Sequence, residues 1–147
     1  MHRLNMAKET YIETIYELVN VRGNVTVTDI ARTLDVKPSS VTEMLRKLDE
    51  MDYVKYFPYR NVTLTVKGVE LAVFLKQAKL SLQAFFKLIG TPDKIAEEDA
   101  CKVEHQLHFS TIKNLTVLVD TMQNTKQGKA LLIVFQKATL NNPLVKG

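Results

Sequence analysis

The sequence has little of what secreted and membrane proteins need. Its single cysteine excludes an internal disulfide. No apolar run approaches the roughly 18 residues of a membrane-spanning helix. The N-terminal stretch MHRLNMAKETYIETIYEL has neither a continuous apolar segment nor a small-residue cleavage site, so we see no signal peptide. These absences predict a cytoplasmic protein that does not enter a membrane.

The sequence also has only a small excess of one charge over the other. The 147 residues carry a net charge of only +4, and their 46% apolar and 24% charged content is ordinary for one large or two small globular domains. Residues 1–70 contain 10 Lys/Arg and 10 Asp/Glu, whereas residues 71–147 contain 10 and 6. A nucleic-acid function for the first half must therefore rest on local pattern, because bulk charge does not support it.

The first half has the periodicities of three helices and a hairpin. Residues 7–21 form one helical stripe, Thr28 and Ser39 are candidate N-caps of two further helices, and two β-rich runs flank PYRN at 58–61. The second half is helical: a long helix from Val66 to about 89, then a helix after Pro92 that includes DACKVEHQLH at 99–108, then two more. We predict a mainly α fold, with a winged helix-turn-helix domain over residues 1–72 and an all-helical domain over 73–147. The apolar surface of residues about 91–140 predicts a two-fold homodimer.

Small polar and basic residues gather on the second helix of the helix-turn-helix pattern and at the hairpin tip. In such proteins the N-terminal part of this helix meets base edges and phosphates. Hydroxyl and cationic side chains suit phosphate oxygens, and a carboxylate can accept from cytosine. The predicted DNA contacts are Lys37, Ser39, Ser40, Thr42, Glu43, Arg46, Lys47 and Arg60.

Four segments together resemble the diphtheria toxin repressor and manganese transport regulator family: ETYIETIYEL, VTDIARTLDVKPSSVTEMLRKLDEMDYV, YRNVTLTVKG and EDACKVEHQLHFS. The resemblance covers roughly residues 6–122 and is closest to the short, two-domain type. It implies a homodimeric, metal-responsive regulator of transcription. It also implies a metal site between the first helix, the long linking helix and the helix that contains ACKVEH.

The resemblance assigns candidate metal ligands residue by residue. Cys101, Glu104 and His105 match the iron-repressor pattern, and Glu13 matches a carboxylate ligand of the manganese type. Thr10 stands where the family has a ligating aspartate or methionine. Two further departures concern a second metal position: Lys79 replaces a histidine, and Gln83 replaces a glutamate found in some members.

Helical geometry gives the same cluster without the family. At about 100° per residue, Cys101, Glu104 and His105 fall on one helical face and can converge on one ion, whereas His108 lies too far along the axis. Thiolate, imidazole and carboxylate together suit Fe(II), Co(II), Ni(II) or Zn(II) better than a metal that takes only oxygen ligands, and we predict Fe(II) ahead of Mn(II) or Zn(II). Because Lys79 brings a positive charge in place of a lone pair, we predict one ion per chain.

The sequence thus predicts a metal-dependent DNA-binding repressor of iron- or manganese-uptake genes that binds a palindromic operator. The alternative is a winged-helix regulator of the same fold that no longer requires metal, which the residues at positions 10, 79 and 83 favour. An enzymatic role is not expected, since no second chemical cluster and no glycine-rich phosphate loop accompany the site.

Overall fold

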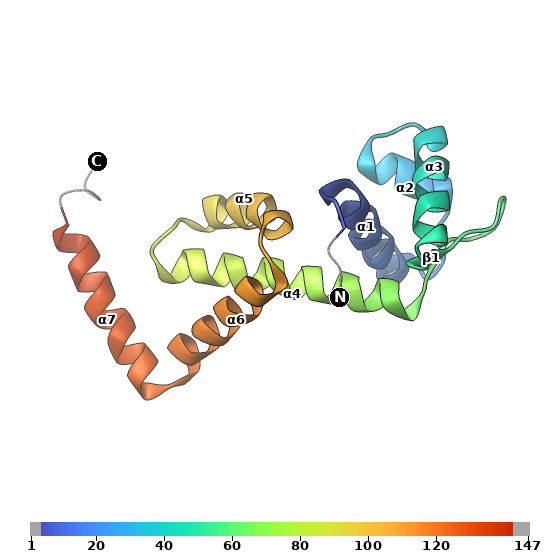
Figure 1. The fold of residues 1–147 in the computed structure, drawn as a ribbon. Coiled ribbons are helices and arrows are strands. Elements are labelled where there is room, and N and C mark those ends of the chain that lie inside the picture. Colours follow the sequence, from blue (N-terminus) through green and yellow to red (C-terminus); the bar gives the residue numbers. More distant parts are fainter. Residues whose placement is uncertain (1–3, 143–147) are drawn as a thin grey trace. The chain divides into compact units, whose positions relative to one another are not determined.

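The computed structural model describes residues 4–142. Its helices and strands are α1 (Met6–Arg22), α2 (Val27–Leu34), α3 (Pro38–Glu50), β1 (Val54–Lys55), β2 (Thr63–Leu64), α4 (Val66–Leu88), α5 (Asp93–Val103), the 3-10 helix η1 (Glu104–Gln106), α6 (Phe109–Asn124) and α7 (Lys126–Asn141) (Figure 1). The chain divides into two compact units between Lys76 and Gln77, inside α4. Within residues 4–142, no helix combines the length and the apolar character that crossing a membrane requires. The prediction of a mainly α fold is confirmed.

The first unit packs α1, α2 and α3 around one apolar core. Helix α1 begins where the side chain of Asn5 accepts from the N–H of Lys8, and it ends at Gly23, whose φ of 76° suits glycine. The side chains that this core buries completely include Ile12, Ile15, Ile30, Val41, Leu45, Leu48 and Val54. Removing this apolar surface from water stabilises the three-helix arrangement.

The predicted caps of α2 and α3, Thr28 and Ser39, are each wrong by two residues. Helix α2 is capped by Thr26, which forms a reciprocal capping box with Asp29. Helix α3 has Lys37 at its N-cap without a side-chain hydrogen bond, and Pro38 occupies the first helical position. Proline supplies the start of α3 because its fixed φ suits the first turn, where no backbone N–H partner is needed.

The wing, residues 54–64, is the predicted hairpin with shorter strands. Val54 pairs with Leu64 and Lys55 with Thr63. Gly68, in the first turn of α4, lies directly behind it: a Cβ added at Gly68 would come within 2.0 Å of the Tyr53 carbonyl oxygen. The start of α4 is therefore packed against the backbone that leads into the wing.

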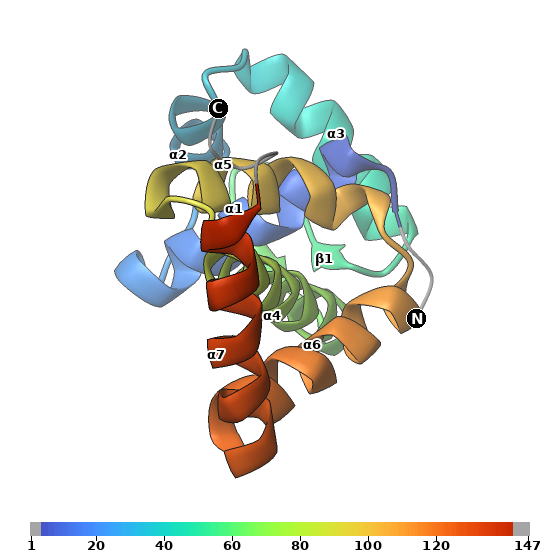
Figure 2. The same ribbon diagram turned by 90° about the vertical axis from the view of Figure 1, so that its left-hand side faces the viewer.

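The second unit joins the C-terminal part of α4 to α5, η1, α6 and α7. The hydroxyl of Thr116 on α6 donates to the hydroxyl of Ser81 on α4 at 2.9 Å. Helices α6 and α7 meet at a sharp corner (Figure 2), where a Cβ on Gly128 would come within 2.2 Å of the Thr121 carbonyl oxygen. Thr125 caps α7 by accepting from the N–H of Gly128. The lack of a side chain at Gly128 thus allows this close approach, and the capping hydroxyl of Thr125 stabilises the start of α7.

Candidate nucleic-acid interface and metal centre

The face of α3 that is open to a ligand follows from the residues that α3 buries. Val41, Leu45 and Leu48 are 0% exposed and face the core. At about 100° per residue, Glu43 points almost directly away from them. The other predicted DNA contacts on α3 that are exposed are Ser39, Ser40, Arg46 and Lys47, with Lys37 at the N-cap, while Thr42 is half-buried. The fold therefore presents this polar helix face to solvent.

Two arginines predicted to contact DNA line one groove. Arg46 of α3, Arg60 of the wing and Thr42 border a hollow of about 450 Å³. The guanidinium carbon of Arg60 lies 5.9 Å from the centre of the Phe57 ring, which limits the directions in which Arg60 can point. Beside it, Tyr59 is fully exposed and has a φ of 63°. Two cations and a hydroxyl around a groove suit the phosphate backbone of a duplex.

Glu43 and Lys47 form an ion pair on the outer face of α3. The Nζ atom of Lys47 lies 2.6 Å from Oε1 of Glu43, and both side chains are largely exposed. The hydrogen bond and the positive charge of Lys47 hold the pKa of the Glu43 carboxyl below its usual range. At neutral pH the pair therefore offers a carboxylate acceptor beside an ammonium donor.

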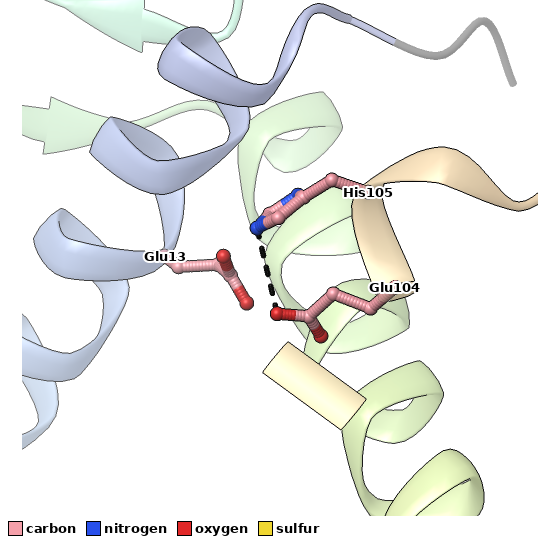
Figure 3. Close-up of side chains that lie close together, drawn as sticks. All are labelled: Glu13, Glu104 and His105. Atoms are coloured by element: carbon pink, nitrogen blue, oxygen red, sulfur yellow. Dashed lines mark ion pairs between the residues drawn. The ribbon is translucent and has the colours of Figure 1, made fainter. Parts of the chain in front are cut away.

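A carboxylate and an imidazole are buried together in the second unit. Nε2 of His105 lies 3.4 Å from Oε1 of Glu104, and these side chains are 4% and 2% exposed (Figure 3). Both residues belong to the 3-10 helix η1, which directly follows α5. Oxygen and nitrogen donors in a buried position suit a divalent transition metal ion.

The prediction that 99–108 forms one helix with one ligand face is wrong. Helix α5 ends at Val103, and the tighter 3-10 turn redirects the side chains that follow. Cys101, which precedes this turn, is exposed, whereas Glu104 is buried. Cys101 lines a surface hollow of about 520 Å³ together with Lys79. The structure does not bring Cys101 together with Glu104 and His105.

The two candidate ligands of the first unit lie on α1. Glu13 is half-buried. The hydroxyl of Thr10 donates to the Met6 carbonyl oxygen at 2.9 Å, inside its own helix. This hydrogen bond occupies the Thr10 proton in α1 and leaves Thr10 a neutral oxygen, which is a weaker metal ligand than a carboxylate.

Two features of the interface escaped sequence reasoning. The contact between Phe57 and Arg60 had only a weak signal, an aromatic residue three positions before an arginine in a short loop. The pairing of Glu43 with Lys47 had a stronger one, since opposite charges four residues apart on a helix are neighbours.

Comparison with known proteins decides the family. The iron dependent repressor N-terminal DNA-binding domain matches residues 3–62, and the iron dependent repressor metal-binding and dimerisation domain matches residues 65–131. The chain belongs to the iron-dependent repressor family. This iron-dependent repressor family member is 37% identical over 133 residues to the HTH-type transcriptional regulator MntR of Bacillus velezensis, covering 90% of this chain and 94% of that protein. It is also 37% identical over 131 residues to MntR of Bacillus subtilis, with coverage of 89% and 92%.

Solved structures share the fold of this repressor family member. The hypothetical protein SSo2273 from Sulfolobus solfataricus superposes with a TM-score of 0.66 at 26% identity, covering 76% of this chain and 86% of that one. ScaR with bound Zn²⁺ gives a TM-score of 0.68 at 28% identity, and the manganese regulator SloR gives 0.63 at 27%. The match covers 77% of this chain and 53% of ScaR, and 84% of this chain and 55% of SloR.

These matches confirm a metal-dependent DNA-binding transcriptional repressor with a dimerisation domain, and not an enzyme. They support a divalent metal, duplex DNA and a second copy of the chain as its partners. The metal-independent alternative receives no support from them.

Proposed function

We propose that the protein is a homodimeric repressor of metal-uptake genes that binds a palindromic operator when a divalent ion is held by Glu104 and His105. The observation that carries this proposal is the buried carboxylate and imidazole pair, with Nε2 3.4 Å from Oε1. The pair lies in the second unit of a chain whose first unit presents an exposed recognition helix. A buried carboxylate is costly unless it is paired or bound to a metal, so the arrangement fits an ion.

Glu13 is our proposed third ligand. Glu13, Glu104 and His105 can each offer one ligand atom, two carboxylate oxygens and one imidazole nitrogen. Glu13 belongs to the unit that contains α3. A ligand set that includes Glu13 would favour the placement at which both recognition helices of a dimer meet successive major grooves. DNA affinity and metal affinity would then be reciprocally linked.

For the ion itself we propose Mn(II), with Fe(II) second, which reverses the order expected from the sequence. The preference for Fe(II) rested on the thiolate of Cys101, and Cys101 is exposed and apart from the buried pair. Carboxylate-rich donor sets suit harder ions such as Mn(II). The solved neighbour SloR, 27% identical, is named a manganese regulator.

We keep the proposal of one ion per chain. Lys79 carries no lone pair when charged, and the hydroxyl of Thr10 donates within α1. Neither residue can replace the histidine or the carboxylate of a second metal position.

The dimer would form through the second unit. Exposed apolar side chains on α6 and α7 include Val117 (64% exposed), Leu131 (55%), Val134 (63%) and Leu140 (72%). Covering them with a second copy removes apolar surface from water. A two-fold axis duplicates α3, and two such helices require two half-sites of a palindrome.

The test is operator binding at controlled metal concentration, using duplexes selected from a random library. We expect a chelator to abolish sequence-specific binding and Mn(II) to restore it. Glu104→Gln should raise the required Mn(II) concentration by more than the roughly 10- to 100-fold that loss of an outer-shell partner costs. The matched control Cys101→Ser should leave that concentration unchanged. Specific binding that persists in chelator would contradict the proposal, and a strong effect of Cys101→Ser would return the thiolate to the ligand set.

A further inference from the structure

The ion pair on α3 places a hydrogen-bond acceptor and a donor side by side. Oε1 of Glu43 and Nζ of Lys47 are 2.6 Å apart, and the two side chains remain 69% and 52% exposed. Both lie on the face of α3 that turns away from the buried Val41, Leu45 and Leu48. A ligand that approaches α3 therefore meets an acceptor and a donor side by side.

One base-pair edge in the major groove is complementary to that unit. In a C·G pair the cytosine N4 amino donor lies beside the guanine O6 acceptor, followed by the N7 acceptor. Base pairing holds N4 and O6 about 2.9 Å apart, close to the separation of the two protein atoms. We propose that the Glu43–Lys47 pair selects a C·G base pair in each half-site of the operator. Glu43 accepts from cytosine N4, and Lys47 donates to guanine O6 and N7.

The other base pairs fit less well. An A·T pair presents the adenine N6 donor between two acceptors, so the second carboxylate oxygen of Glu43 faces adenine N7 and is repelled. Thymine O4 can accept from Lys47, but the thymine methyl group stands beyond it where guanine offers a second acceptor, N7, so Lys47 loses one of its two contacts. In the reversed base pair, G·C, the cytosine amino donor lies opposite the Lys47 ammonium, and the guanine acceptors lie opposite the Glu43 carboxylate. The discrimination thus comes from mismatched polarity as much as from the matched contacts.

The same two residues could be an ordinary solvated ion pair, and the chain contains one for comparison. Lys55 and Asp52 lie 2.8 Å apart with side chains 54% and 66% exposed, but they are outside α3. What distinguishes Glu43 is its position on the helix face proposed to enter the groove. A carboxylate there is repelled by phosphates, and a base contact that only a carboxylate or amide can make compensates for this repulsion.

The inference rests on the proposed function, and its experiment separates the two. Native protein with Mn(II) is used to select duplexes from a random library, and the selected base at each operator position is compared with that selected by Glu43→Gln and Lys47→Met. Asp52→Asn is the control, because Asp52 has a φ of 59°, which asparagine tolerates. Native protein and Asp52→Asn should prefer C·G at one position of each half-site by roughly tenfold.

Glu43→Gln should change the preferred pair at that position to A·T, because glutamine pairs with adenine N6 and N7. Lys47→Met should weaken the preference for guanine there. The inference is overturned if Glu43→Gln retains C·G at every position, or if it only raises affinity for all sequences. Absence of any sequence-specific binding by the native protein with Mn(II) would overturn the proposed function, and this inference with it.

Discussion

Replacing Gly68 by alanine should destabilise the protein, although the same change usually stabilises a helix. Gly68 lies in the first turn of α4 with an ordinary helical conformation, where alanine is favoured over glycine by up to about 1 kcal/mol. The added Cβ, however, would come within 2.0 Å of the Tyr53 carbonyl oxygen and 3.1 Å of a Leu64 side-chain carbon. The sign of the stability change therefore depends on whether this steric overlap or the helix propensity is the larger contribution.

The structure indicates that the steric overlap is the larger contribution. An ordinary contact at that point needs about 3.5 Å, so the Tyr53 backbone or α4 must move by more than 1 Å. The same carbonyl oxygen accepts from the N–H of Thr65 at 3.1 Å, and this movement would weaken that bond. Overpacking costs about 1–3 kcal/mol and the hydrogen bond about 1 kcal/mol, against at most about 1 kcal/mol gained in propensity. We expect a net loss of roughly 1–3 kcal/mol.

Urea unfolding followed by circular dichroism measures this change, and Gly23 supplies the matched comparison. Gly23 has a φ of 76° and no atom within 4 Å of an added Cβ, so its strain is conformational. With a ψ of −50°, Gly23 also lies outside the left-handed helical region that asparagine tolerates, so alanine and asparagine should both be costly there. At Gly68, where the obstacle is the Tyr53 backbone, asparagine should be no better than alanine. A Gly68→Ala variant as stable as the native protein, or more stable, would refute the reasoning.

Three other predictions concern the interface, the metal and pH. Arg46→Ala and Arg60→Ala should each weaken binding to all duplexes and reduce the salt slope by about 1, and unchanged slopes would remove both from the phosphate contacts. Calorimetric titration with Mn(II) should give one ion per chain, and the Mn(II) affinity should weaken as pH falls because protons compete for the imidazole. Lys79→His should move the stoichiometry toward two. Two ions in the native chain would contradict the single site. Thr26→Ala should cost about 1 kcal/mol at pH 7 through loss of the α2 cap. The hydrogen bonds from Thr26 hold the pKa of Asp29 below its usual range, so their stabilisation is present above the ordinary aspartate pKa and is lost as pH falls through the lower folded value. In urea unfolding from pH 7 down to pH 3, the difference in unfolding free energy between the native protein and Thr26→Ala should therefore narrow. A difference that widens as pH falls would contradict the prediction.

Much of the fold could be predicted from local signals. The 3.6-residue apolar period over residues 7–21 predicted α1, and the helical periodicity that follows Ser39 predicted α3. The run around PYRN predicted the wing because turn residues between β-rich runs favour a hairpin. Cap positions were less accurate, since Thr26 and Thr28 are both good caps by composition, and the reciprocal bond with Asp29 decides between them.

The amino-acid sequence by itself determined which residues repeat on which helix face, and hence that α3 presents Ser39, Glu43 and Lys47 to a ligand. Periodicity suffices there because one regular helix relates neighbouring side chains. Only the tertiary structure decided that α5 ends at Val103, that Glu104 and His105 turn into a buried position and that Cys101 stays exposed. A helical period carries no information about where a helix tightens into a 3-10 turn. It depends on which side chains the folded chain buries, and Glu104 is 1% exposed.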